Sequence, residues 1–155
     1  MSRITVVVVI TAAFMAGFLA SAQGASSRAR ARSITLRARS QLLHAHLVDN
    51  PPAGRSPGDV LVFTERLLST SGRIIGSDAA TCTQLFDQRS LCTGAYLLRG
   101  GEVLVSLLQP GPTGTYDQVI TGGTGRYARA AGTVTVHQHP SSGDRFVFHI
   151  HLPAR

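Results

Sequence analysis

The stretch that decides the fold is "ITGGTGRYARAAGTVTV", residues 120–136. Its segment Gly123–Ala128 matches the pattern G-x-G-x-x-G/A, in which glycines cradle the pyrophosphate of a dinucleotide. Asp144 follows at nearly the distance of the acidic residue that binds the ribose in such sites. The alternative is a tight corner between two β-strands, in which the glycines adopt positive φ angles. A dinucleotide site also needs a strand before the loop, a helix after it and a parallel sheet around both.

The sequence on either side decides between these interpretations. No segment has a 3.6-residue apolar period long enough for a crossover helix, which a parallel nucleotide-binding sheet would require. The chain instead divides into eight β-rich runs separated by Gly, Pro, Asp and Ser. The runs are TLRARSQLLHAHLV (35–48), DVLVFTERLL (59–68), RIIGSDAATCT (73–83), LCTGAYLLR (91–99), EVLVSLL (102–108), TYDQVIT (115–121), GTVTVHQH (132–139) and DRFVFHIHL (144–152). The sequence therefore predicts an antiparallel all-β fold, a barrel or a sandwich. In such a fold Gly122, Gly123 and Gly125 form a structural turn, and we expect no cofactor.

The N-terminal residues have the pattern of an export signal. Arg3 precedes an apolar run over residues 4–20, and Ala20-Ser21-Ala22 forms an A-x-A cleavage site. The alternative is an uncleaved membrane anchor, since the run approaches the length of a short spanning helix. Small residues follow the run and no basic cluster abuts it, which favours cleavage. We expect a signal peptide over residues 1–22, a secreted mature chain, and membrane contact only before cleavage after Ala22.

The net charge of +7 is concentrated near the expected mature N-terminus. Five arginines lie within residues 23–40, whereas nine arginines oppose eight acidic residues from Gln41 onward. An almost neutral domain argues against nucleic acid as a partner. We expect an Arg-rich N-terminal tail over residues 23–40 and a β-barrel domain over residues 41–155. A solvated tail and a tether to a polyanion or to the cell envelope are the alternative roles of these arginines.

Cys82 and Cys92 are the only cysteines in the sequence. An even pair in a secreted chain is typical of a disulfide. A hairpin turning near Asp87 and Gln88 would set the two opposite each other on one face. Two free thiols or a redox pair are the alternatives, but the sequence contains no C-x-x-C motif. We therefore expect a disulfide between Cys82 and Cys92.

The stretch VITGGTGRYARAAGTVTV, residues 119–136, resembles the Gly-Gly-Thr-Gly-x-Tyr/Phe-x-x-Ala-x-Gly corner of the allene oxide cyclase and dirigent barrel superfamily. The similarity extends over most of the mature chain. GDVLVFTERL resembles the second strand of the family, RIIGSDAATCT its third strand and FVFHIHL its closing strand. The chain is most similar to small secreted actinobacterial proteins with an allene-oxide-cyclase-like barrel, which share the paired cysteines. The corner motif is specific to the fold rather than to one reaction.

The resemblance implies an eight-stranded antiparallel barrel whose apolar interior is filled by side chains or holds one small ligand. Relatives include plant cyclases that act on an unstable fatty-acid epoxide, dirigent proteins that steer radical coupling, and bacterial barrel cyclases. Their cavities hold a reactive substrate in one conformation and exclude water. The expected function is therefore a barrel that binds a small apolar or amphipathic molecule. It acts as an isomerase or cyclase, or as a non-catalytic binding or interaction module. Relatives form dimers and trimers, which implies a homodimer or homotrimer.

Three side chains are candidate catalytic groups in such a cavity. In LVFTERLL, residues 61–68, the alternation puts Glu65 on one face with apolar residues, and burial there would raise its pKa and make it an acid or hydrogen-bond donor. The opposite face pointing inward would leave Glu65 in solvent. Asp49 lies where dirigent-type relatives carry an acid at the barrel mouth, but it precedes NPPAG and equally suits a turn. Tyr96, like Tyr116, could offer a hydroxyl to a ligand or be a core tyrosine with one wet end.

The histidines form three H-x-H pairs, and residues two apart on a strand share a face. The pairs are His44 and His46, His137 and His139, and His149 and His151. If the apolar residues of these strands point inward, every pair points outward, where clustered imidazoles suit Zn, Cu or Ni. For the apolar residues of the last two predicted strands to share one face of the sheet, the residue numbers of directly paired positions must have an even sum. Pairing Ser141 with Arg145 would put His137 opposite His149. No acid or cysteine completes a closed site, so we interpret the histidines as polar surface residues and expect no bound metal.

Overall fold

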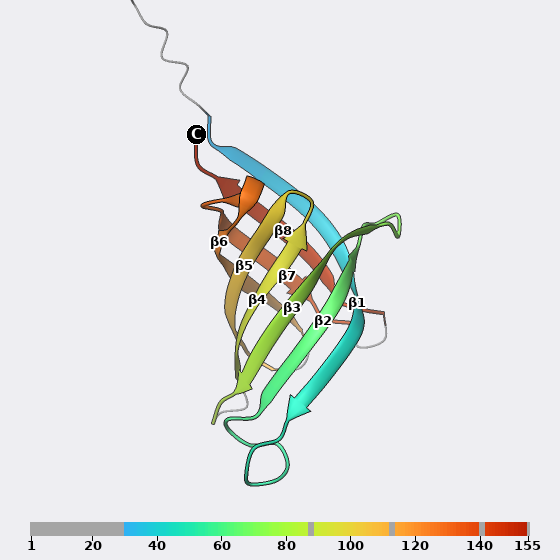
Figure 1. The fold of residues 1–155 in the computed structure, drawn as a ribbon, viewed down its shortest axis with the longest axis vertical. Coiled ribbons are helices and arrows are strands. Elements are labelled where there is room, and N and C mark those ends of the chain that lie inside the picture. Colours follow the sequence, from blue (N-terminus) through green and yellow to red (C-terminus); the bar gives the residue numbers. More distant parts are fainter. Residues whose placement is uncertain (1–29, 87–88, 112–113, 140–141, 155) are drawn as a thin grey trace, which may run out of the picture.

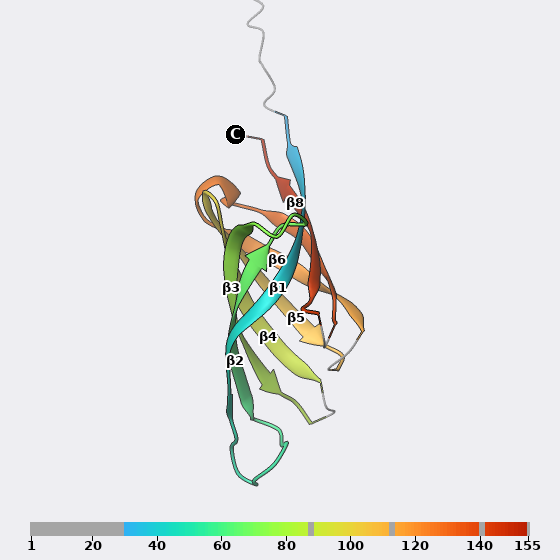
Figure 2. The same ribbon diagram turned by 90° about the vertical axis from the view of Figure 1, so that its right-hand side faces the viewer.

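The computed structural model describes residues 30–86, 89–111, 114–139 and 142–154, and the expected signal peptide lies outside them. The described residues form a closed barrel of eight antiparallel strands, in which each strand pairs with the next and β8 pairs with β1 (Figure 1, Figure 2). The elements are β1 (Arg32–Val48), β2 (Val60–Leu68), β3 (Ile74–Gln84), β4 (Ser90–Leu98), β5 (Gly101–Gln109), β6 (Thr115–Gly123), the 3-10 turn η1 (Gly125–Tyr127), β7 (Ala131–His137) and β8 (Arg145–Leu152). The predicted eight-stranded antiparallel barrel is confirmed. Among the described residues, no helix is long and apolar enough to cross a membrane.

Alternation of residue type decides which face of each strand points into the barrel. β8 illustrates this, because Phe146, Phe148 and Ile150 are buried whereas His149 and His151 are exposed. Successive side chains of a strand point to opposite faces, so one face of β8 is apolar and the other polar. Burial of the apolar faces inside the closed barrel is the main force that stabilises the fold.

β1 closes the barrel because it is long enough to pair with two neighbours. Its 17 residues pair with β8 over Arg32–Arg39 and with β2 over Arg39–Val48. In Figure 1 this strand runs diagonally from the end of the barrel where β8 ends to the opposite end. The barrel therefore begins at Arg32 and not at Gln41, which corrects the expected boundary of the tail. Arg37 and Arg39 are exposed and alternate with half-buried or buried residues such as Leu36 and Ala38, as the polar face of a strand does.

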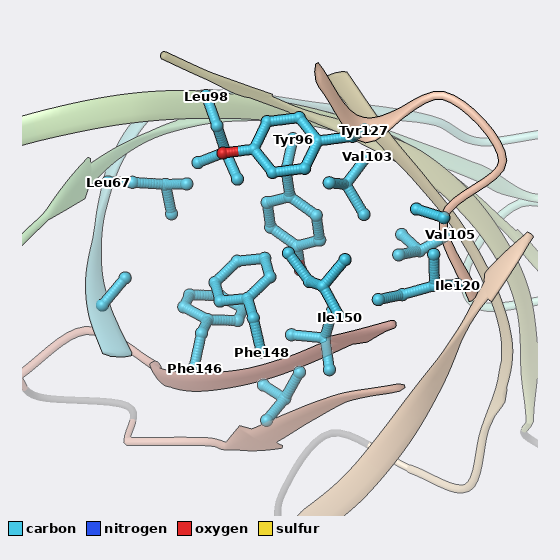
Figure 3. Close-up of a cluster of buried hydrophobic side chains, with 14 residues drawn as sticks. Leu67, Tyr96, Leu98, Val103, Val105, Ile120, Tyr127, Phe146, Phe148 and Ile150 are labelled. Atoms are coloured by element: carbon cyan, nitrogen blue, oxygen red, sulfur yellow. The ribbon is translucent and has the colours of Figure 1, made fainter. Parts of the chain in front are cut away.

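One end of the barrel is filled by apolar side chains (Figure 3). The largest fully buried ones are Phe148, Leu67, Ile150, Val103, Val134 and Val136. The ring of Tyr96 packs edge-on against Phe148, with ring centroids 4.8 Å apart, and against Phe146, with centroids 5.7 Å apart. Edge-to-face contacts of this kind contribute about 0.5–1.5 kcal/mol beyond the burial of the rings. Packed apolar side chains therefore fill the interior at this end.

The glycine-rich stretch is a corner between β6 and β7. β6 ends at Gly123, η1 follows at once, and β7 begins at Ala131. Gly125 has a φ of 57°, and a Cβ atom there would clash with the carbonyl oxygen of Gly100. The backbone N–H of Arg126 donates to that same carbonyl over 2.8 Å, so the two segments must approach closely. Gly125 thus lies in the turn, whereas Gly122 and Gly123, also expected there, are the last residues of β6 and pair with β5. The strand that follows the corner is antiparallel, which no dinucleotide loop allows.

The expected disulfide between Cys82 and Cys92 is confirmed. The two cysteines are directly paired between β3 and β4, with Cα atoms 4.0 Å apart, and both are buried. They are separated by 10 positions in the chain. A closed loop of that size contributes about 2.5–3 kcal/mol in the chain-entropy model. The disulfide faces the interior near the end of the barrel opposite the filled core.

Candidate functional site

A cavity of about 240 Å³ lies inside the barrel beyond the filled end. Short inward side chains leave this space, because Ala80 of β3 lies directly opposite Gly94 of β4. Phe63 and Leu107 form apolar parts of the wall, together with the disulfide. Tyr96 belongs both to the filled core and to the cavity wall, so it marks the inner boundary of the cavity. This volume lies just below the range of pockets that hold drug-sized ligands, so it suits a smaller organic molecule.

The cavity continues toward the loops at the open end of the barrel. Leu61, Cys82 and Gln109 line both the cavity and an adjoining recess of about 370 Å³. Arg55 and Asp59, from the loop between β1 and β2, line the outer part of this recess. The cavity and this recess are therefore adjacent, and the loop between β1 and β2 borders the recess.

Glu65 and Asp78 lie opposite each other in the wall of the cavity. They are directly paired in the register of β2 and β3, and both line the cavity. Directly opposed residues on one face of an antiparallel pair have Cβ atoms about 4.5–5.5 Å apart. Of the two orientations considered for Glu65, the structure has the inward one.

Burial raises the pKa of both carboxyl groups. Removal from water raises the pKa of Glu65 to about 7, against the effect of a hydrogen bond with the Ser40 side chain and with a further increase from the charge of Asp144. Removal from water also raises the pKa of Asp78 to about 8, and the charge of Glu65 is the next largest cause. Two interacting carboxyls titrate as a pair. Near neutral pH the pair therefore holds at least one proton, so one member can donate a proton while the other accepts one.

Asp78 is the more deeply buried member of the pair, with 7% of its surface exposed. Its Oδ1 atom has no hydrogen-bond partner among the described residues, and the same holds for Oε1 of Gln138. Both residues line the cavity. A buried acceptor without a partner costs about 1–3 kcal/mol, which a ligand that donates a hydrogen bond would recover.

Two tyrosines add phenol groups to the cavity wall. Tyr96 is 2% exposed, and its hydroxyl donates to Oε1 of Gln118 over 2.7 Å. Burial, followed by the charge of Asp78, raises the pKa of Tyr96 far above its ordinary value. Burial, followed by the charge of Asp144, raises the pKa of Tyr116 in the same way. Both phenols therefore stay protonated, and the hydroxyl of Tyr96 is already engaged with Gln118.

Asp49 is not part of this arrangement. It follows β1 directly, is exposed, and does not line the cavity. Its Oδ2 atom accepts the backbone N–H of Gly54 over 3.1 Å. The structure thus places Asp49 in the turn-forming role that its sequence context also suggests, away from Glu65, and does not support it as a cavity acid.

Sequence reasoning does not identify Asp78 or Asp144 as residues of the cavity. For Asp78 a signal was available, because Cys82 faces inward and residues four positions apart on a strand share a face. Asp144 has no comparable signal, since it lies in the loop before β8. Its position depends on Ser40 of β1, whose Oγ accepts the backbone N–H of Asp144 over 3.0 Å and whose own N–H donates to the carbonyl of Asp144 over 2.8 Å.

The strand histidines lie on the outside of the barrel. Nδ1 of His151 lies 3.0 Å from the Ser33 hydroxyl, and Nδ1 of His137 lies 2.9 Å from the Thr115 hydroxyl. His44 and His46 line a recess on the outer surface of β1 to β6. The described part of the chain contains no group of three or more His, Cys, Asp or Glu residues that could hold a metal ion.

The suggested pairing of His137 with His149 is wrong. His137 pairs with Arg145, and His149 pairs with Thr133, although the paired numbers do have an even sum. The ladder stops before the position of Asp144 because that residue instead bonds to β1 and accepts the backbone N–H of His139 over 3.0 Å. The imidazoles of the two strands are therefore not directly opposed.

No protein-family model and no curated protein matches the sequence. Solved structures do match the fold. A pyocyanin demethylase has a TM-score of 0.69 and 24% identity, over 76% of this chain and 99% of that chain. The exo-specific intermolecular Diels-Alderase AbnU has a TM-score of 0.64 and 12% identity, over 79% of this chain and 99% of that chain. The pterocarpan synthase dirigent protein GePTS1 has a TM-score of 0.63 and 13% identity, over 79% of this chain and 92% of that chain. At these identities the similarity shows the fold alone, which is that of the allene oxide cyclase and dirigent-like barrels.

Proposed function

We propose that this protein binds a small, largely apolar molecule in the barrel cavity and isomerises or cyclises it by proton transfer. The observation that carries the proposal is the opposed pair of Glu65 and Asp78 inside the cavity. Their pKa values of about 7 and about 8 allow one protonated and one ionised carboxyl to coexist near neutral pH. Carboxyl groups adjusted in this way by burial serve as acids and bases in many enzymes.

In the proposed reaction the ionised carboxylate accepts a proton from one atom of the ligand, and the protonated carboxyl returns a proton to another atom. The ligand keeps its composition, so no oxidant, reductant or second substrate is required. A proton that passes between the two opposed carboxyls restores the starting state. The apolar wall contributes by holding the ligand in one conformation and excluding water.

The similar structures support a small organic ligand. Their names describe a demethylase of pyocyanin, a Diels-Alderase and a pterocarpan synthase. These activities differ, so the shared fold suggests a cavity that orients a small molecule rather than one particular reaction.

A non-catalytic binding module is the second candidate. It is favoured by the filled end of the barrel and by the engagement of the Tyr96 hydroxyl with Gln118, which leave fewer groups to take part in chemistry. The two candidates share the cavity and differ in the role of Glu65.

We expect Glu65→Gln to lower kcat by about 100-fold or more, because an amide cannot exchange a proton with the ligand. The compound for the assay is the one that native mass spectrometry finds bound to the untagged protein from its culture medium. Glu102→Gln is the matched control and should leave kcat unchanged, because Glu102 alternates with the buried Val103 of β5 and does not line the cavity. Unchanged turnover in Glu65→Gln would remove that residue from the mechanism. A compound that binds and is never converted would favour the non-catalytic module.

We further propose that the protein is secreted after removal of residues 1–22. The disulfide supports this, since such bonds form in oxidising compartments. N-terminal sequencing of the protein from culture medium should find Gln23 as the first residue. A mature chain that still begins at Met1 would contradict cleavage.

A further inference from the structure

We propose that the cavity takes an organic cation: an apolar, flat molecule that carries a single ammonium or similar positive charge. The proposal rests on the proposed function of the cavity and specifies the class of its ligand. It is argued from the charges on the wall, from the acceptors that lack partners, and from the aromatic rings beside them.

The described titratable side chains of the cavity wall are carboxylic acids and phenols, and none of them is a base. Glu65, Asp78 and Asp144 line the cavity, whereas none of the described lining residues is Arg, Lys or His. The remaining polar side chains of the wall are neutral amides, hydroxyls and phenols. The described arginines and the six histidines lie outside this wall, and Arg55 lines the adjoining recess together with Asp59. Once Glu65 and Asp78 are ionised, a carboxylate or phosphate ligand would meet negative charges with no cationic side chain in the described part of the wall, which disfavours anions.

The wall also offers acceptors that lack a partner. Oδ1 of Asp78 belongs to a side chain with only 7% of its surface exposed and has no hydrogen-bond partner among the described residues. Oε1 of Gln138, another residue of the wall, also has no hydrogen-bond partner among the described residues. Burial of such acceptors is costly unless a donor is supplied. An ammonium group supplies several N–H donors and a charge opposite to that of the carboxylates.

Aromatic rings lie next to these acceptors. Tyr96, Tyr116, Phe63 and Phe146 all line the cavity together with Asp78. Faces of aromatic rings attract cations, and their apolar area suits a flat hydrocarbon body. The site thus combines an apolar body-binding wall with a negative pole at Glu65 and Asp78.

Binding of a cation must depend on pH. The titratable groups that face the site are Glu65 from β2, Asp78 from β3, Tyr96 from β4, Tyr116 from β6 and Asp144 before β8. The phenols stay protonated because their pKa values are raised. Glu65 and Asp78 become charged as the pH rises through about 7 and about 8. The preference for a cation should therefore grow over that interval.

The test uses three probes with the same two-ring body: 1-naphthylmethylamine, 1-naphthylmethanol and 1-naphthoate. Their dissociation constants for the wild-type protein are measured by calorimetry at about pH 6 and about pH 8.5. We expect the amine to bind about tenfold more tightly than the alcohol at the higher pH, a difference of about 1.4 kcal/mol, and the anion to bind most weakly. The preference for the amine should shrink severalfold at the lower pH.

Variants then locate the negative pole. Asp78→Asn should reduce the amine-to-alcohol preference and leave the affinity for the alcohol unchanged. Asp117→Asn, on the exposed face of β6, should leave both unchanged. If Asp78→Asn fails to fold, the comparison of probes on the wild-type protein decides alone.

The outcomes separate the two proposals. Tight binding of the alcohol with equal or weaker binding of the amine at the higher pH would overturn the cation and leave the cavity function standing. Binding of none of the three probes would contradict both. A preference for the amine that Asp78→Asn does not change would place the negative pole elsewhere and overturn this assignment.

Discussion

Raising the pH from about 5 to about 9 should lower the free energy of unfolding by on the order of 4 kcal/mol. The cause is the pair of buried carboxyls, whose pKa values rise from 4.5 to about 7 for Glu65 and from 3.8 to about 8 for Asp78. Between the unfolded and folded pKa values the native state binds more protons than the unfolded state. Stability is therefore greatest when both groups are protonated and is lost as the pH rises through about 7 and about 8. Because the two carboxyls interact, their pKa shifts are not fully additive. The expected loss of stability is therefore smaller than the sum of the losses calculated for each group alone.

Urea unfolding at a series of pH values measures this dependence. Asp78→Asn should flatten the curve and make the protein more stable than the wild type at the highest pH, since the amide has no charge to bury. Asp117→Asn is the matched control on an exposed strand position and should keep the slope of the wild type, including the contributions of all other titrating groups. A wild-type curve that is flat between about pH 5 and about pH 9 would show that the pair is not buried as described.

Gly125→Val should lower the free energy of unfolding by about 3–5 kcal/mol. Two effects act together at this corner. The φ of 57° is unfavourable for a β-branched residue, and the new Cβ atom would clash with the carbonyl oxygen of Gly100, so the backbone has to move. That movement would disturb the hydrogen bond from Arg126 to the same carbonyl.

Denaturant unfolding again provides the measurement. Gly111→Val is the control, because a Cβ atom there would meet nothing within 4 Å and its φ is not in the left-handed region. The control should cost less than about 1 kcal/mol. Equal stabilities of the two variants would mean that the corner is not constrained by close backbone contact.

Period-two alternation and turn residues are local signals, and they predict an antiparallel all-β fold, while the resemblance of the glycine-rich corner to a known family narrows this fold to a barrel. Glu65 illustrates the limit of these signals: alternation placed it on one face with apolar residues but left open whether that face points inward. Local signals fail where a distant contact decides the outcome. Asp144 enters the cavity wall through hydrogen bonds to Ser40, 104 positions earlier in the chain, and the same contacts end the ladder beside His137.

The boundary of β1 shows a different kind of failure. Exposed arginines at alternate positions have the composition of a tail, yet their neighbours face a barrel interior that only exists once β8 is present. Charge density alone therefore does not distinguish a solvated tail from the outer face of a closing strand.

The dependence of β1 on β8 also constrains the order of folding. The hydroxyl of Ser33 and the imidazole of His151, which meet where these strands pair, are 118 positions apart. Contacts so distant in the chain carry a large loop-closure entropy and slow the search for the native topology. The pairing of β1 with β8 cannot form until β8 itself has been synthesised. Without β8, strands β1 and β7 would lack one neighbour each, and such unpaired edges are prone to pair with other chains.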